Sequence, residues 1–254
     1  MSKVYIGTSG FTYLHWKGVF YPLDFPQSRW LEYYSQHFKT VEINASFYHQ
    51  MDKKVYEGWA KRTSQDFIFT VKGSRFITHI KRLKDCQEPV EKFLESVSGL
   101  GEKLGVILWQ LPPRWKVDIA RLEEFLELIS PVKVRPLGRT DLAEGIRHAF
   151  EFRDKSWLNP QIYETLKNHN AALVIQDSPA WPTEEAITAD FTYLRFHGRD
   201  SLYGSCYNME ELKMWTTKIK RWQKKGLDIY AFFNNDAQGY AVRNAEELTE
   251  LVSL

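Results

Sequence analysis

Three stretches of the sequence, ALVIQD (residues 172–177), FTYLRFHG (191–198) and IYAFFNND (229–236), share one pattern, an apolar run that ends in polar residues. Two further runs end in the same way, at Val41-Glu42-Ile43-Asn44 and at Glu151-Phe152-Arg153. Strands of a parallel α/β barrel are buried on both faces, so they read as continuous apolar runs, and function gathers at their carboxyl ends. The pattern therefore predicts such a barrel, with a site at these strand ends.

Eight short runs rich in β-forming residues are predicted to be strands, at residues 4–8, 40–44, 67–72, 105–110, 148–153, 172–177, 191–197 and 228–234. Helical periodicity is clear between consecutive strands, except between strands six and seven. We therefore expect a single TIM-type (β/α)8 barrel domain over residues 1–254, with a loop in place of that one helix. Four residues are expected to cap helix N-termini, namely Asp118, Asn159, Asn208 and Asn244.

Composition restricts the class of protein. The net charge of +2 gives no general field for holding a polyanion, so any anion site must be local. Cys86 and Cys206 form no Cys-x-x-Cys pair, which argues against a disulfide framework or a thiolate metal site. No apolar run approaches the roughly 18 residues of a membrane span, and the first residues lack a signal-peptide core. We expect a soluble cytoplasmic protein with no membrane partner, and no motif fixes its oligomeric state.

Polar residues on the strands fall on the parity that should point into the barrel, because side chains alternate along a strand. This set contains Ser9, Glu42, Asn44, Thr70, Lys72, Gln110, Glu151, Arg153, Asp177, Tyr193, Arg195, His197 and Asn234. Charges of both signs are present, and buried charges persist only when they are paired or bound to a ligand. Three interpretations remain open.

In the first interpretation, Lys72, Arg153 and Arg195 bind a phosphate or carboxylate, for which the rigid donor fork of arginine is suited. Glu42 or Glu151 would then act as base and His197 as proton donor, with no metal required. Replacement of Arg195 by alanine is expected to abolish anion binding and to leave the fold intact. The remaining predicted ligand-binding residues are Ser9, Asn44, Gln110, Trp157 as a stacking wall, Asn234 and Asn235.

In the second interpretation, Glu151, Asp177 and His197 ligate Mn or Zn, as in a metal-dependent sugar isomerase or epimerase. In the third, acidic and basic side chains only pair across the barrel mouth, and the protein is at most a non-catalytic module that binds an anion or nucleic acid. His49 and His79 are expected to be ordinary loop or packing residues. Phosphate-loop, dinucleotide and His-Glu-x-x-His motifs are absent from the sequence, and the carboxylate pair of the common barrel glycosidases is missing.

A family resemblance rests on motifs that span nearly the whole chain: Gly7-Thr8-Ser9-Gly10-Phe11, Val41-Glu42-Ile43-Asn44, Leu108-Trp109-Gln110-Leu111-Pro112-Pro113, Glu151-Phe152-Arg153, Tyr193-Leu194-Arg195-Phe196-His197-Gly198 and Phe233-Asn234-Asn235-Asp236. Together they resemble the YecE-like family, also called domain of unknown function 72. The resemblance implies a TIM-type barrel with no settled activity. That barrel is similar to the endonuclease IV and xylose-isomerase group, which favours a phosphodiester or sugar-phosphate ligand, although this chain lacks the ligands of a trinuclear zinc centre. The leading hypothesis is an intracellular enzyme that hydrolyses or rearranges a nucleotide, nucleic-acid end or sugar phosphate.

Overall fold

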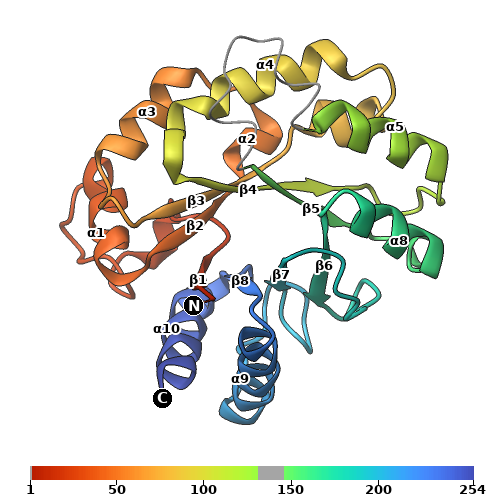
Figure 1. Ribbon diagram of the computed structural model, residues 1–254. Helices are drawn as coiled ribbons and strands as arrows, with labels where there is room; N and C mark the ends of the chain where they lie inside the picture. The colour runs from red at the N-terminus through yellow and green to blue at the C-terminus, as the bar shows by residue number, and fades with distance from the viewer. Residues whose placement is uncertain (1, 131–145) are drawn as a thin grey trace.

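The computed structural model describes residues 2–130 and 146–254, and its eight strands form a parallel, nearly closed barrel (Figure 1). Their order around the barrel is β1-β8-β7-β6-β5-β4-β3-β2. All eight predicted strands are present, and their ends differ from the prediction by no more than about two residues. The strands are β1 (Val4–Thr8), β2 (Thr40–Ile43), β3 (Ile68–Lys72), β4 (Leu104–Gln110), β5 (Arg147–Glu151), β6 (Ala172–Asp177), β7 (Phe191–Phe196) and β8 (Asp228–Phe233).

Helices surround the outside of this barrel, as Figure 1 shows. They are α1 (Trp30–His37), α2 (Ala45–Tyr48), α3 (Lys53–Lys61), α4 (Gln87–Val97), α5 (Ile119–Ile129), α8 (Pro160–Asn168), α9 (Met209–Lys224) and α10 (Tyr240–Ser253). Residues 178–190, between β6 and β7, contain no helix, which confirms the prediction of a loop there. Among the described helices, none combines the length and the apolar character that crossing a membrane would require.

Predicted N-caps are confirmed at three of four positions. The side chains of Asp118, Asn159 and Asn208 each accept a hydrogen bond from a backbone N–H of the first helical turn. Asn244 is not a cap, because α10 begins earlier, after Gly239, whose φ of 77° suits a residue without Cβ. Asn244 is instead buried inside α10. Its side chain accepts a hydrogen bond from Tyr207 N (2.9 Å) and donates one to Tyr207 O (2.9 Å), which anchors the loop after β7.

Two hydrophobic layers fill the structure. The larger lies between the strands and the helices, and the smaller fills the barrel interior with Val106, Leu108, Ala149, Ala172, Val174, Phe191, Tyr193, Tyr230 and Phe232. Toward the carboxyl ends of the strands, every second residue after this inner layer also points into the barrel. Polar side chains there lie above an apolar floor, which positions the candidate site.

The barrel closes between β1 and β2 at a seam that does not use a regular ladder. A single parallel bridge joins Ser9 to Glu42. On the amino-terminal side of this bridge, the buried hydroxyl of Tyr34 donates to Thr40 O (3.1 Å) and accepts from Thr8 N (3.0 Å). Gly7 permits the close approach of the two strands, because a Cβ at this position would lie 2.3 Å from Thr40 O. The Tyr34 hydroxyl thus replaces missing backbone hydrogen bonds.

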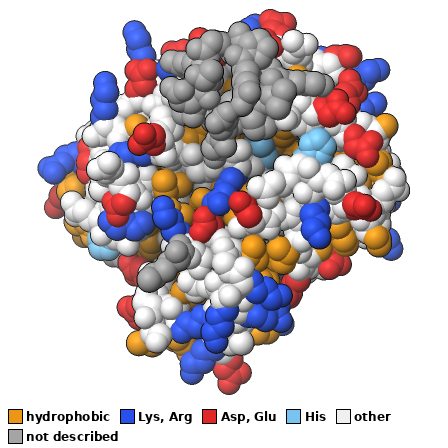
Figure 2. Space-filling model, viewed as in Figure 1, with side chains coloured by type: hydrophobic (Ala, Val, Ile, Leu, Met, Phe, Trp, Pro, Cys, Tyr) orange, Lys and Arg blue, Asp and Glu red, His pale blue; other side chains and the backbone are white. Residues whose placement is uncertain are grey.

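Surface charge is mixed on the face of the molecule that Figure 2 shows. Acidic and basic side chains are interspersed over most of the described part of this face, and basic side chains gather at the bottom of the view, over α9. This distribution agrees with the net charge of +2 in the sequence and provides no continuous basic surface over the face in view.

We predict that Tyr34→Phe lowers the free energy of unfolding by about 1–3 kcal/mol, because Thr8 N and Thr40 O then lose a buried partner. Urea denaturation measures this effect. Tyr33→Phe is the matched control, since the Tyr33 hydroxyl makes no hydrogen bond to a described residue and its ring is only partly buried. Equal unfolding free energies for the two variants would contradict this role of the Tyr34 hydroxyl.

Candidate functional site

A cavity of about 550 Å³ lies at the carboxyl ends of the strands. Six of the predicted site residues line it, namely Asn44, Lys72, Gln110, Arg153, Arg195 and Asn234. The others that contact it are Tyr13, Phe47, Tyr48, Arg75, His79, Tyr203 and Asp236. The strand parity deduced from the sequence therefore places these six side chains around one space.

Arg195, near the end of β7, is the central charged residue of this site and is almost fully buried. Its Nη2 and Nε atoms donate to the two carboxylate oxygens of Glu42 on β2, at 2.7 and 3.0 Å. Its Nη1 atom also donates to Glu151 on β5. Burial alone would lower the pKa of Arg195, but Glu151 and Glu42 raise it above its ordinary value. The guanidinium is thus permanently charged and shared by two carboxylates.

Glu151 has a second cationic partner. Arg153 Nε donates to Glu151 Oε1 (2.7 Å), and the Arg153 guanidinium carbon lies 3.7 Å from the ring centroid of Trp181. Burial would raise the pKa of Glu151, but Arg195 and Arg153 outweigh it and lower that pKa well below its ordinary value. Glu151 is therefore an ionised, ion-paired carboxylate. Among the described residues, no carboxylate accepts a hydrogen bond from the terminal Nη atoms of Arg153.

Lys72, at the end of β3, differs from the two arginines because no described carboxylate pairs with it. Its Nζ atom lies 4.1 Å from the ring centroid of Phe47, and the side chain is almost fully buried. Burial, followed by repulsion from Arg195, lowers the pKa of Lys72 to about 7. This amine is the buried basic group of the cavity with the least stabilised positive charge.

Several buried acceptors around the cavity lack a donor among the described residues. They are Asn44 Oδ1 and Gln110 Oε1, which belong to residues lining the cavity, and Ser9 Oγ, whose residue is buried at the end of β1 and does not line the cavity. Buried polar atoms are normally hydrogen-bonded, so atoms without a protein partner in a cavity are suited to bind a ligand or water. These side chains can accept hydrogen bonds from ligand hydroxyl or amino groups.

His197 is buried one layer below the cavity surface, under the rings of Trp181 and Tyr203. Asn234 Nδ2 donates to its Nδ1 atom (3.1 Å), which places the imidazole proton on Nε2. Nε2 lies 3.9 Å from Glu151 Oε2 and has no hydrogen-bond partner among the described residues. Burial and Arg195 hold the pKa of His197 well below its ordinary value, so the ring is neutral.

The predicted metal set of Glu151, Asp177 and His197 is wrong about Asp177. Val174 belongs to the inner layer of β6, so Gln176 faces the interior and Asp177 faces α9, where its Oδ2 atom accepts from Trp215 Nε1 (3.1 Å). The prediction for β6 was out of register by one residue, and such an error exchanges the faces of a strand. Within residues 2–130 and 146–254, no group of three His, Cys, Asp or Glu side chains could hold a metal ion.

Trp157 and Asn235 also lie outside the cavity. Trp157 is buried, stacks on Phe152 with ring centroids 4.9 Å apart, and donates from Nε1 to Trp115 O (2.7 Å). It is a core residue and not a stacking wall. Asn235 Nδ2 donates to Ser205 O (2.9 Å) and to Asn244 Oδ1 (3.0 Å), so it positions the loop after β7.

Two residues stand out among those that the sequence interpretation had missed. Trp181 covers Arg153 from the loop that replaces the sixth helix, and no periodic pattern marks it. His79 lines the cavity, although it was expected to be an ordinary loop residue. Burial and Lys72 lower the pKa of His79 to about 4, so its half-buried ring is neutral at pH 7. Its position in a long loop after a strand could have indicated a site residue.

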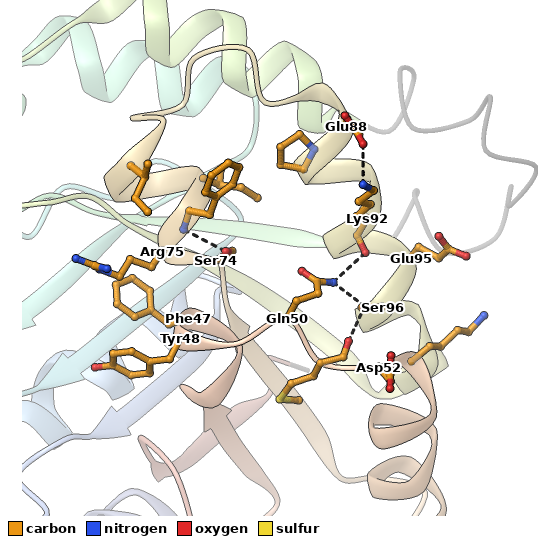
Figure 3. A pocket seen from close by; sticks show the side chains of 16 residues that line it. Phe47, Tyr48, Gln50, Asp52, Ser74, Arg75, Glu88, Lys92, Glu95 and Ser96 are labelled. Carbon is orange, nitrogen blue, oxygen red and sulfur yellow. Dashed lines mark hydrogen bonds and ion pairs between the residues drawn. The ribbon is translucent and has the colours of Figure 1, made fainter.

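A second hollow, of about 830 Å³, adjoins the cavity and shares Phe47, Tyr48 and Arg75 with it. We call it the side groove. It runs from α2 past the single π-helical turn Phe76–Ile80 to α4 (Figure 3). In Figure 3, Phe47, Tyr48 and Arg75 lie together at one end, whereas Glu88, Lys92 and Glu95 lie along α4 at the other.

Comparisons with known proteins agree with the resemblance in the sequence. The profile of a family described as "Protein of unknown function DUF72" matches residues 5–254. UPF0759 protein YunF of Bacillus subtilis is 27% identical over 287 residues, covering 99% of this chain and 95% of YunF. UPF0759 protein YecE of Escherichia coli K12 is 26% identical over 217 residues, covering 76% of this chain and 75% of YecE.

Solved structures confirm the fold. A DUF72 family protein from Thermotoga maritima superposes with a TM-score of 0.84 and 32% identity, covering 99% of this chain and 100% of that one. SacUVDE superposes with a TM-score of 0.57 and 7% identity, covering 100% of this chain and 98% of that one. At this identity the second likeness concerns the barrel fold alone.

We predict that Arg195→Met lowers the free energy of unfolding at pH 7 by about 3–5 kcal/mol, because two buried carboxylates lose their shared partner. This differs from the expectation that the residue is dispensable for folding. In the wild type the lowered pKa of Glu151 contributes stability that is present above its unfolded pKa of about 4.5 and is lost as the pH falls through the folded pKa. In the variant, burial instead favours the protonated acid. The stability deficit should therefore shrink between pH 7 and pH 5, as measured by urea denaturation.

A second substitution provides the control for this prediction. Among the described residues, Glu42 has no cationic partner other than Arg195, whereas Glu151 keeps Arg153. Adding Glu42→Gln to Arg195→Met removes the carboxylate that has lost its partner and should recover part of the lost stability. A deficit that is independent of pH, or no recovery in the double variant, would contradict the assignment of Arg195 as the common counter-ion.

Proposed function

Because the chain belongs to the DUF72 family, which carries no established function, we propose a function from the geometry of its own residues: the barrel mouth binds a ligand through a phosphate group. The ligand would be a nucleotide, a nucleic-acid end or a sugar phosphate, and the protein would hydrolyse or rearrange it. The observation that carries this proposal is the buried amine of Lys72, which has no carboxylate partner among the described residues. A buried ammonium needs a counter-ion, and a bound anion supplies one.

Charge balance supports the same conclusion. Three cations, Lys72, Arg153 and Arg195, face two carboxylates, Glu42 and Glu151, so the group carries one positive charge in excess when Lys72 is protonated. Arg195 is occupied by both carboxylates. The anion would therefore contact Lys72 and the terminal nitrogens of Arg153, with Arg195 as the residue that fixes the carboxylates in place.

Neutral groups around these cations are suited to the rest of the ligand. Asn44 and Gln110 present side-chain oxygens without donors, which would accept hydrogen bonds from ligand hydroxyl groups. The side-chain amide of Asn234 is engaged by His197 Nδ1, to which its Nδ2 atom donates. Asn234 therefore serves the ligand as part of the cavity lining.

Proton transfer during turnover would not use the carboxylates as the sequence suggested. Glu42 accepts three hydrogen bonds, from Arg195 Nε and Nη2 and from Tyr193 (2.7 Å), and Glu151 has a strongly lowered pKa. We assign this role to His79, a neutral imidazole on the cavity surface, whose lowered pKa would rise toward neutrality beside a phosphate dianion. Glu42 and Glu151 are positioning residues in this account.

A second candidate function is a module that binds such a ligand without turning it over. The complete pairing of both carboxylates favours it, because neither is free to accept a proton. Product analysis after incubation with nucleotides and sugar phosphates, with and without Mn, separates the two functions. Formation of product that is lost in His79→Ala supports the enzyme, whereas ligand affinity with no product under any condition supports the module.

We place the function in the cytoplasm. Both cysteines, Cys86 and Cys206, are free thiols in the described structure, as expected for a protein that folds in a reducing compartment.

We predict that Lys72→Met weakens the binding of inorganic phosphate by about tenfold or more, because a charge-assisted hydrogen bond contributes about 1.5–3 kcal/mol. Removing the donor fork in Arg153→Met should have a comparable effect. Lys225→Met, at an exposed position remote from the site, is the control and should bind phosphate as the wild type does. Isothermal titration at pH 6.5 provides the dissociation constants. Unchanged phosphate affinity in a folded Lys72→Met protein would overturn the proposed site.

A further inference from the structure

The side groove opens directly from the mouth cavity, because Phe47, Tyr48 and Arg75 line both. A ligand whose phosphate lies between Lys72 and Arg153 could therefore extend into the groove. The volume of the groove, about 830 Å³, is in the range of small-molecule sites.

The charge of the groove differs from that of the mouth. Its three basic residues, Lys53, Arg75 and Lys92, are matched by three acidic ones, Asp52, Glu88 and Glu95, so the described lining has no net charge. Lys92 Nζ is also already paired with Glu88 (2.6 Å). A second phosphate in the groove would find no excess of positive charge, so the groove is suited to an uncharged part of the ligand.

Exposed apolar side chains give the groove its binding surface. Tyr48, Phe76 and Ile80 are 69%, 47% and 62% exposed, far more than the core aromatic residues of this chain. Aromatic rings at the surface of a hollow provide flat faces on which a planar heterocycle can stack. The combination indicates a neutral, planar group.

Polar groups on one wall of the groove are already ordered. Gln50 Nε2 donates to Ser96 Oγ (2.9 Å), and Ser96 Oγ donates to Met51 O (2.7 Å), as the dashed lines in Figure 3 mark. This leaves Gln50 Oε1 without a donor among the described residues. A fixed carbonyl oxygen is suited to accept a hydrogen bond from the amino or imino group of a base.

We propose that the mouth and the side groove together bind a nucleoside monophosphate, with its phosphate at Lys72 and Arg153 and its base in the groove. This inference rests on the proposed phosphate site and specifies its ligand class. A simple sugar phosphate would leave the exposed aromatic surface unused. A continuing nucleic-acid strand would bring further phosphates to the acidic residues along α4.

Binding measurements on the whole chain test this proposal. Isothermal titration compares adenosine and uridine monophosphates with ribose 5-phosphate, inorganic phosphate, adenosine and a short oligonucleotide. We expect at least one nucleoside monophosphate to bind about tenfold or more tightly than ribose 5-phosphate, because of the stacking of the base. Phe76→Ala and Ile80→Ser, at exposed positions outside the mouth, should reduce this ratio toward one and leave ribose 5-phosphate affinity unchanged. Leu23→Ala, 70% exposed and outside the lining of the groove, is the matched control.

The outcomes distinguish failure of this inference from failure of the phosphate site. Equal affinities for nucleoside monophosphates and ribose 5-phosphate in the wild type would overturn the base site and leave the phosphate site standing. Tighter binding of the oligonucleotide than of either monophosphate would overturn the proposal of a mononucleotide site and favour a nucleic-acid strand as the ligand. If no phosphate compound binds, both proposals fail.

Discussion

The ion pairs of Arg195 with Glu42 and Glu151 are the constraint on which the rest of the barrel mouth depends. They connect three strands, β2, β5 and β7, above the apolar interior of the barrel. Each partner is buried, so none could remain charged alone. Arg195 pairs with both acids, so Lys72 and the terminal nitrogens of Arg153 are left to face the cavity. The three cations of the mouth are thus not all balanced by its two carboxylates, and the group keeps a net positive charge.

That imbalance connects the fold with the proposed function. Lys72 lies at the end of β3 beside Phe47, and Phe47 in turn separates it from the side groove. The mouth is therefore a small cationic space, and the groove next to it is larger, carries exposed apolar side chains, and has no net charge in its described lining. Two adjoining spaces of different character are suited to a ligand with an anionic end and a neutral planar end. The carboxyl-terminal face of an α/β barrel provides such combinations because its loops vary while its strands hold the charged groups in place.

Periodicity was sufficient to predict the strands and most of the charged cluster. Glu42, Lys72, Glu151, Arg153 and Arg195 were placed together because alternation along a strand depends on local geometry alone. The same rule failed for Asp177, since both Gln176 and Asp177 are polar and only packing against Trp215 selects the face. Trp157 and Asn244 were misplaced because a large aromatic or an amide suits a core contact as well as a site or a cap. His79 and Trp181 lie on irregular loops, whose paths depend on tertiary contacts that no periodic pattern encodes.

The central claim is that the buried Lys72 amine is the anion-binding group of this barrel. The most direct measurement is a pH titration of the Lys72 side chain by NMR of protein labelled with ¹³C-lysine, assigned with Lys72→Arg and repeated in the presence of inorganic phosphate. Because burial and Arg195 lower the pKa of Lys72 to about 7, and because an anion favours the charged amine, this account predicts a resonance that titrates near neutrality and moves to higher pH with phosphate. A resonance that titrates near 10.5, or one that phosphate leaves unchanged, would contradict the account.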